Sequence, residues 1–167
     1  HVIILAGDQV TLGLRPVILG PPTSAVPAQM TRVERRLGNV ARLLGYTVTR
    51  FAERLEVTLV WQRESPSSTS EYKVFMHLRD GGTIVSQHDG VPADDGRPVW
   101  SWRPGEIIVD RHSVPLDKVK PGIYALVIGL YDPISGARVP AYDSLGRRLA
   151  SDEIPLASIR LEDNYGL

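Results

Sequence analysis

From about residue 39 onward, hydrophobic and polar residues alternate along the chain with a period of two. One apolar face of residues 55–61, for example, consists of Leu55, Val57, Leu59 and Trp61. Successive side chains of a β-strand point to opposite faces, so this pattern predicts strands with one face in a core. Turn sequences rich in Gly, Pro and Asp separate the alternating stretches. Further strands are predicted at residues 71–79, 83–88, 106–114, 138–141 and 153–161. Residues 124–131 are apolar on both faces, which predicts a central strand covered on both sides.

Helical patterns are almost absent from the sequence. No long stretch has the spacing of three and four residues typical of an amphipathic helix, and only residues 29–37 and 115–119 could form short helical turns. About eight short strands at spacings of roughly ten residues are typical of an all-β protein. We therefore expect an antiparallel β-sandwich, immunoglobulin-like or jelly-roll, with a closed barrel as the further alternative.

The first 28 residues differ in composition from the rest of the chain. Residues 11–19 could form one strand, and the run from Gly20 to Pro27 has the proline content of a linker. We therefore divide the chain into an N-terminal extension or linker, residues 1–28, which could add one edge strand, and a sandwich domain, residues 29–167. No apolar run approaches the roughly 20 residues that a membrane-spanning helix needs.

Composition excludes several classes of function. The chain has 19 Lys plus Arg and 19 Asp plus Glu, so a nucleic-acid binder held by a basic field is excluded. It has no cysteine, which removes disulfides, thiol nucleophiles and thiolate zinc sites. Neither a glycine-rich phosphate-binding motif nor a Gly-x-Ser-x-Gly nucleophile motif is present. We expect no cofactor.

The histidines are the first candidates for chemistry. His77 and His88 fall on the two arms of a predicted hairpin whose turn lies at residues 80–82. A two-residue turn would place both rings on one face together with Phe75, and His112 from a later strand could complete a three-histidine metal site. The alternative is that they are ordinary strand histidines, because their spacing matches no metal-ligand signature. We assign no metal site and keep His77 and His88 as the candidates for one.

Carboxylates are the second candidates. Five of them occur within a short stretch, and two that face each other across a cleft could hydrolyse a glycosidic bond. Asp94 and Asp95 could instead bind calcium, although no calcium-loop pattern is present. In a loop rich in Gly and Pro, however, Asp most often bonds its own backbone in a turn, and we expect no catalytic residue in this chain. The five are Asp89, Asp94, Asp95, Glu106 and Asp110.

Aromatic residues are the third candidates, because exposed rings stack on the apolar faces of sugars. Trp100 and Trp102 lie in the long loop before residue 106, and loops commonly carry binding residues. Trp61 falls on an apolar strand face and is expected in the core, and Trp102 could be a core residue as well. The charged residues near Asp110 could form either a buried ion pair or a polar binding cleft. The candidate ligand-binding residues are Trp100, Trp102, Arg103, His88, Asp89, Asp110 and His112.

An ordered series of short motifs spans residues 39–161. The series resembles the soluble C-terminal region of many bacterial membrane glycosyltransferases, which are themselves similar to the dolichyl-phosphate-mannose–protein mannosyltransferases. The motifs are Leu43-Leu44-Gly45-Tyr46, Leu55-x-Val57-x-Leu59-x-Trp61, Tyr72-x-Val74-Phe75-Met76-His77-Leu78, Gln87-His88-Asp89-Gly90-x-Pro92, Trp102-Arg103-Pro104-Gly105-Glu106, Val109-Asp110-Arg111-His112, Pro121-Gly122-x-Tyr124 and Gly129-Leu130-Tyr131-Asp132, followed by Arg138.

The resemblance implies a context and not a catalytic residue. In such enzymes the transfer reaction would occur in the membrane-spanning part, which this chain lacks. The resemblance implies an extracytoplasmic sandwich tethered to the membrane, with the membrane-embedded part of its own parent chain as a partner. We expect a non-catalytic accessory domain that binds glycan or glycosylation acceptor near that enzyme. The alternatives are a structural domain that packs on its parent or self-associates, and a glycosidase-like or metal-dependent hydrolase.

Overall fold

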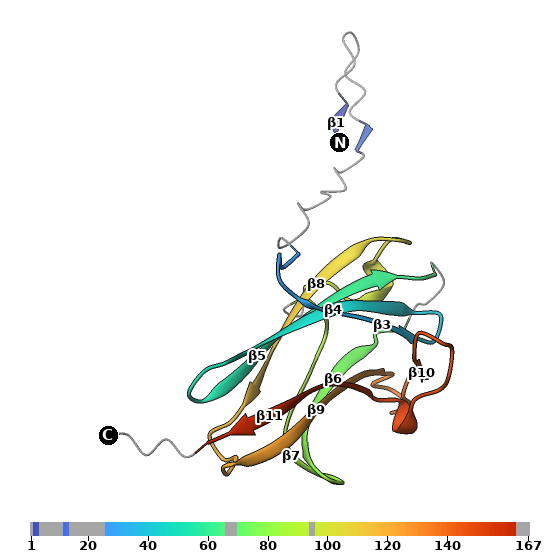
Figure 1. Cartoon of the computed structure of the whole chain (residues 1–167). Coiled ribbons are helices and arrows are strands. Elements are labelled where there is room, and N and C mark those ends of the chain that lie inside the picture. The colour runs from blue at the N-terminus through green and yellow to red at the C-terminus, as the bar shows by residue number, and fades with distance from the viewer. Residues whose placement is uncertain (1, 4–11, 14–25, 66–69, 94–95, 163–167) are drawn as a thin grey trace.

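Two antiparallel β-sheets face each other and enclose the core (Figure 1). This computed structural model describes residues 2–3, 12–13, 26–65, 70–93 and 96–162. The expected all-β sandwich is confirmed. Of the strand expected at residues 11–19, only residues 12 and 13 are described, as β2 (Leu12–Gly13), which pairs with β1 (Val2–Ile3) in a separate ladder.

The first sheet has five strands and the second has four, and all neighbours are antiparallel. Two one-turn 3-10 helices, η1 (Val99–Ser101) and η2 (Ala150–Asp152), are the only helices in the ranges given above. In spatial order, the first sheet contains β10 (Ala141–Tyr142), β3 (Thr31–Leu37), β4 (Ala41–Arg50), β5 (Arg54–Arg63) and β8 (Ile107–Pro115). The second contains β11 (Ile154–Leu161), β9 (Gly122–Tyr131), β6 (Lys73–Asp80) and β7 (Thr83–Gly90).

The strand order is immunoglobulin-like. In that fold the first, second and fifth strands share one sheet, and the third, sixth and seventh share the other. Counted from β4 and leaving out the two-residue β10, the first, second and fifth strands are β4, β5 and β8, and the third, sixth and seventh are β6, β9 and β11, which reproduces this division; the fourth, β7, lies beside β6. A tyrosine corner accompanies the fold. Here the Tyr124 hydroxyl, near the start of β9, donates to the Lys120 carbonyl at 2.7 Å.

The core lies between the sheets and is built from alternate residues of the strands. Trp61 and the inward leucines and valines of β4, β5, β6 and β9 are almost fully buried in one cluster. Each such side chain contributes roughly 1.5–3 kcal/mol relative to leaving it in water. The central position predicted for residues 124–131 is confirmed, because β9 lies between β11 and β6. Its outward side is covered in part: Val127 is 6% exposed, and the Phe75 ring lies against Gly129.

The short helix considered for residues 29–37 is wrong, because this segment forms β3. Its side chains alternate in exposure from Thr31 to Leu37, and its backbone pairs with β4 on one side and β10 on the other. The segment contains so many arginine and glutamate residues that its alternation is hard to see in the sequence, because only Val33 and Leu37 are apolar. Residues 115–119 form no helix, and Val119 N–H donates to the Leu116 carbonyl in a single turn.

The strands β7 and β8 are edges of the two sheets, and they lie on the same side of the sandwich. The Ser86 hydroxyl of β7 donates to the Pro115 carbonyl of β8 at 2.6 Å and bridges the two edges. Most of the histidine and aspartate candidates come from these strands. No helix in the part of the chain that the structure describes is long and apolar enough to cross a membrane.

Candidate functional site

A β-bulge in the β6–β7 hairpin decides where the two hairpin histidines lie. The turn at Gly81 and Gly82 is the predicted one, and Arg79 pairs with Ile84 beyond it. The next pair is Leu78 with Ser86, so Val85 is an extra residue on β7. One extra residue reverses the faces of all residues that follow it.

The prediction that His77 and His88 share one face is therefore wrong. His88 lies opposite Met76, which is fully buried, and so it faces the other sheet. His77 points to the outer face of the second sheet, where its ring centroid lies 4.8 Å from that of Phe75. A site that joins His77, His88 and His112 cannot form in this fold. No group of three or more His, Asp or Glu side chains arranged to hold a metal occurs among the described residues.

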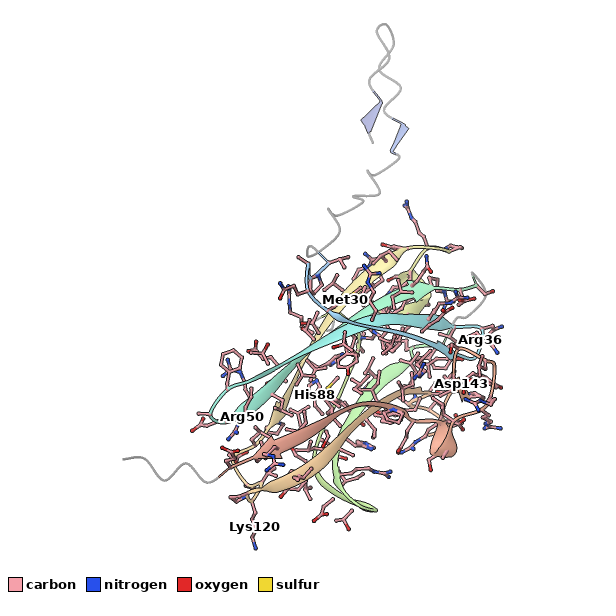
Figure 2. All side chains as sticks on the ribbon, viewed as in Figure 1. Met30, Arg36, Arg50, His88, Lys120 and Asp143 are labelled. Carbon is pink, nitrogen blue, oxygen red and sulfur yellow. The ribbon has the colours of Figure 1, made fainter. Side chains whose placement is uncertain are left out.

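An open groove of about 530 Å³ lies at the β7–β8 edge. His88, which is labelled in Figure 2, is one of the residues that line it. His88 and His112 face the interior, and their ring centroids lie 5.2 Å apart. Thr58 and Arg111 are partners on the outer side of β5 and β8, so the groove passes around the edge of the first sheet. Its wall combines polar side chains with two valines. The lining residues are Thr49, Glu56, Val57, Thr58, His88, Val91, Arg111, His112 and Ser113.

A buried carboxylate behind the groove fixes one of its walls. Asp110 is fully buried, and its Oδ2 accepts hydrogen bonds from the indole Nε1 of Trp61 at 3.0 Å and from His112 Nε2 at 2.8 Å. Its Oδ1 accepts the backbone N–H of Ala93 at 2.8 Å. The carboxylate therefore has three donors, and the histidine ring is held with its Nε2 hydrogen directed at Asp110. Of the two readings left open for this segment, a buried Arg–Asp pair is not formed, because the partner of Asp110 is His112 and Arg111 is exposed. The polar binding cleft stays a prediction.

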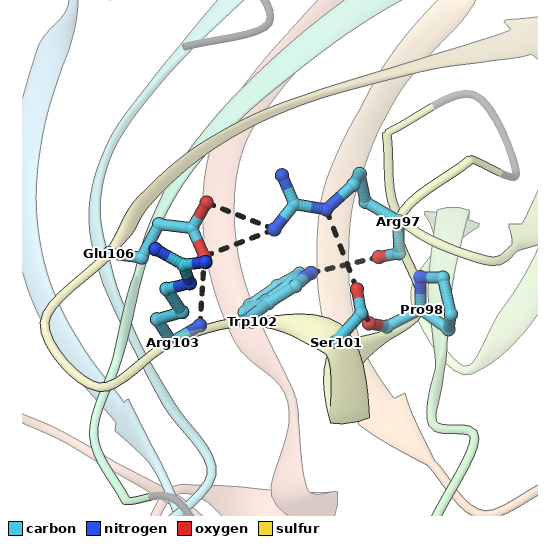
Figure 3. Close-up of polar contacts among 6 residues, drawn as sticks. All are labelled: Arg97, Pro98, Ser101, Trp102, Arg103 and Glu106. Carbon is cyan, nitrogen blue, oxygen red and sulfur yellow. Dashed lines mark hydrogen bonds and ion pairs between the residues drawn. The ribbon is translucent and has the colours of Figure 1, made fainter. Parts of the chain in front are cut away.

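The loop before β8 is clamped by its own polar groups (Figure 3). Glu106 accepts two hydrogen bonds from Arg97 Nη2, at 2.9 and 3.0 Å, and one from the backbone N–H of Arg103 at 2.8 Å. Trp102 is 4% exposed, and its indole donates to the Arg97 carbonyl at 2.8 Å, so its ring faces are unavailable to a ligand. Trp100 is 53% exposed, and the loop presents its ring to solvent. Arg103 is also exposed.

Asp89 belongs to a different surface from His88, because the two are neighbours on one strand. It lies opposite Phe75 on the outer face of the second sheet, where it accepts a hydrogen bond from Tyr131. Burial raises the pKa of Tyr131 most, and the charge and hydrogen bond of Asp89 raise it further. On the same face, the guanidinium of Arg138 stacks over the Phe75 ring at 4.4 Å.

His77 is buried within this outer face. Its ring is 6% exposed, and its Nδ1 has no hydrogen-bond partner. Burial lowers the pKa of His77 most. The charges of Asp89 and Glu153 act to raise it, and those of Arg138 and Arg79 act to lower it. Glu153 accepts hydrogen bonds from both of these arginines at 2.8 Å and closes the network over the sheet.

The structure thus divides the predicted residues among three places. His88, Asp110 and His112 come together at the groove, Trp100, Trp102 and Arg103 lie on the clamped loop, and Asp89 and His77 lie on the far face of the second sheet. Of the carboxylates, Asp94 and Asp95 lie outside the described residues. Asp89, Glu106 and Asp110 occupy these three different places and form no facing pair.

Sequence reasoning missed the outer wall of the groove. Thr49, Glu56 and Thr58 occupy polar positions that alternate with the apolar face of β4 and β5, and the sequence analysis names none of them as a candidate. The sequence feature that could have indicated them is a run of hydrogen-bonding side chains on one strand face. Recognising this run as the wall of a groove requires knowing that β5 lies beside β8, which the sequence did not reveal.

Comparisons of the chain with family models, with curated proteins and with solved structures found no match. The proposal that follows therefore depends on the geometry of the groove and on the motif series in the sequence.

Proposed function

We propose that this chain is a non-catalytic accessory domain that binds glycan at the β7–β8 groove. The groove volume of about 530 Å³ falls within the range of small-ligand sites, roughly 300–1,000 Å³. Its lining offers both donors and acceptors, which suits hydroxyl groups, together with apolar surface from the partly exposed Val91. This mixed lining on rigid strands, with His112 fixed by Asp110, is the observation that carries the proposal.

The exposed ring of Trp100 supplies a second contact in this proposal. His112 lies five residues into β8, so roughly 17 Å of strand separates it from Ile107 at about 3.3 Å per residue, and Trp100 lies in the loop before Ile107. A linear glycan that runs along β8 would reach from the groove to the loop. Stacking on an aromatic face adds about 0.5–1.5 kcal/mol. Trp102 has a supporting role, because it anchors the loop in the core.

The motif series extends the proposal to the parent protein. We propose that the domain belongs to a membrane glycosyltransferase, lies on the extracytoplasmic side and holds glycan or acceptor near the catalytic part. Tethering raises the local concentration of the bound sugar, so an affinity in the millimolar range would suffice.

The alternative of a self-associating domain is less well supported by the sheet edges. Edge strands that pair with other chains are long and regular, whereas β7 carries the bulge at Val85 and β11 carries Pro155 and a second irregularity before Ala157. The edge β10 has two residues, and the regular edge β8 ends at Pro115, where Ser86 of β7 bridges to it. Proline and bulges are common means of preventing edge-to-edge pairing. These features favour a ligand at the groove over strand addition at the edges.

The test is a glycan array on the purified chain, followed by calorimetric titration of each hit with matched pairs of variants. His88→Ala should weaken binding, whereas Gln87→Ala, one residue away on the opposite face, should not. Trp100→Ala should weaken binding by about three- to tenfold, from the stacking energy above, and Phe51→Ala, an exposed aromatic elsewhere, should not. A clean negative array at millimolar sugar, or equal affinities within both pairs, would contradict the proposal.

A further inference from the structure

Two surface turns of this chain are built alike, and each presents an apolar side chain at its tip. In the first, the Oδ1 of Asp132 accepts the backbone N–H of Ile134 at 2.8 Å. In the second, the Oδ1 of Asp143 accepts the backbone N–H of Leu145 at 2.9 Å. Ile134 is 96% exposed and Leu145 is 76% exposed, the two highest values for large hydrophobic side chains in the described ranges. Each aspartate fixes its turn, so the apolar tip is held outward.

Both turns lie at the same end of the sandwich. The segment between them crosses from the second sheet to the first, and Gly38, in the β3–β4 turn, donates to the Pro140 carbonyl at 2.7 Å. Tyr142 then pairs with Arg36 near the end of β3. Figure 1 shows β10, which leads into the second turn, at this end of the molecule. The two tips therefore flank one short surface.

The two turns themselves offer mainly positive charge to solvent, and the exposed carboxylate beside the second turn, Glu34, is paired with Arg42. The side chains of Arg147 and Arg148 are 74% and 61% exposed. Their carboxylate partners, Asp143 and Asp152, are only 13% and 15% exposed, and they also accept backbone hydrogen bonds. The acidic groups are thus withdrawn into the turns while the guanidinium groups reach outward.

We propose that this end of the domain docks on an anionic lipid surface, with Ile134 and Leu145 entering the headgroup region and the arginines contacting phosphates. A specific protein interface buries roughly 1,200–2,000 Å², which two separate tips do not supply. A bilayer accepts single apolar side chains without a complementary pocket, and anionic headgroups attract nearby arginine. This site goes beyond glycan binding and shares no residue with the groove.

The test is co-sedimentation of the full chain with vesicles of phosphatidylcholine alone or mixed with phosphatidylglycerol. We expect stronger partition into the anionic vesicles, weakened by salt. Ile134→Ser and Leu145→Ser should each lower the partition coefficient about tenfold, and the double variant should lower it further. Neither tip packs in the core, so these variants should keep the fold, which thermal unfolding verifies.

The matched control is Ile123→Ser, since Ile123 is 59% exposed at the start of β9, the opposite end of that strand from Ile134. Equal loss in the control, an unchanged double variant, or no preference for anionic vesicles would each overturn the proposal. Because the vesicles carry no glycan, and the double variant should keep the glycan affinity of the wild type, failure of this proposal is distinguishable from failure of the glycan site.

Discussion

Replacing Asp110 by asparagine changes the chemistry of the buried anchor while keeping its shape. The carboxylate accepts three hydrogen bonds, two at Oδ2 and one at Oδ1, and all three donors are N–H groups of Trp61, His112 and Ala93. An amide has only one oxygen, so in Asp110→Asn its NH₂ group must face at least one of these donors. That donor then loses its acceptor in a site without solvent.

The expected loss of stability follows from the number of hydrogen bonds that the substitution breaks. One buried N–H without a partner costs about 1–3 kcal/mol, and bonds to a charged acceptor contribute about 1.5–3 kcal/mol where neutral ones contribute about 1. We expect Asp110→Asn to lower the free energy of unfolding by about 2–4 kcal/mol. For a domain of this size that is a fall in Tm of roughly 7–15 °C.

Urea unfolding followed by tryptophan fluorescence measures this change. Asp117→Asn is the control, because Asp117 is exposed in the turn after β8 and the same substitution there should change the stability by less than about 0.5 kcal/mol. If Asp110→Asn is no more destabilising than Asp117→Asn, the three hydrogen bonds do not anchor the fold and this reasoning is refuted.

Two further predictions concern the outer face of the second sheet. Gly129→Ala should destabilise the domain by about 1–3 kcal/mol in urea unfolding, because a Cβ there would lie 2.3 Å from the Phe75 ring. The control Gly82→Ala has open space around the new Cβ and should be close to neutral. Equal effects of the two substitutions would contradict this packing. The pKa of His77 is lowered by burial, so its contribution to stability is present above its ordinary pKa of about 6.5 and is lost as the pH falls below it. Unfolding measured from pH 7 to pH 5 should show a decline, with a slope of at most about 1.4 kcal/mol per pH unit from this group, that is smaller in His77→Gln; identical pH profiles would exclude this origin.

The period of two was enough to predict most of the fold. It placed the strands around Leu59, Val74 and Ile108, because each alternates an apolar face with a more polar one, and the run around Leu126, apolar on both faces, indicated a central strand. It failed at β3, where arginines on the solvent face outnumber the apolar residues and only pairing with β4 and β10 makes the segment a strand. The strand propensity of a segment predicts its structure poorly where hydrogen bonding to the neighbouring strands determines it.

The site was predictable only in part, for a physical reason. Asp110 and His112 are two residues apart on one strand, so the sequence alone places them on the same face. Their contact with Trp61 depends on β5 lying beside β8, although two strands, β6 and β7, separate them in the chain. His88 joined them only because of the extra residue Val85, and a single inserted residue leaves no trace in the alternation of a polar edge strand.

The buried carboxylate links the two contacts that we propose for glycan. Ala93 has a φ of +57°, a left-handed conformation that costs a non-glycine residue about 1–3 kcal/mol, and its N–H is the group that Asp110 holds. This bond fixes the chain just beyond Val91, which lines the groove, and just before the clamped loop that presents Trp100. Losing the carboxylate alone leaves its donors without an acceptor, but a whole buried polar network replaced by apolar residues of similar volume is often equally stable, so net stability does not explain why such a network is present. The role of Asp110 is to position its neighbours, because its three hydrogen bonds hold both the groove wall and the start of the loop in place.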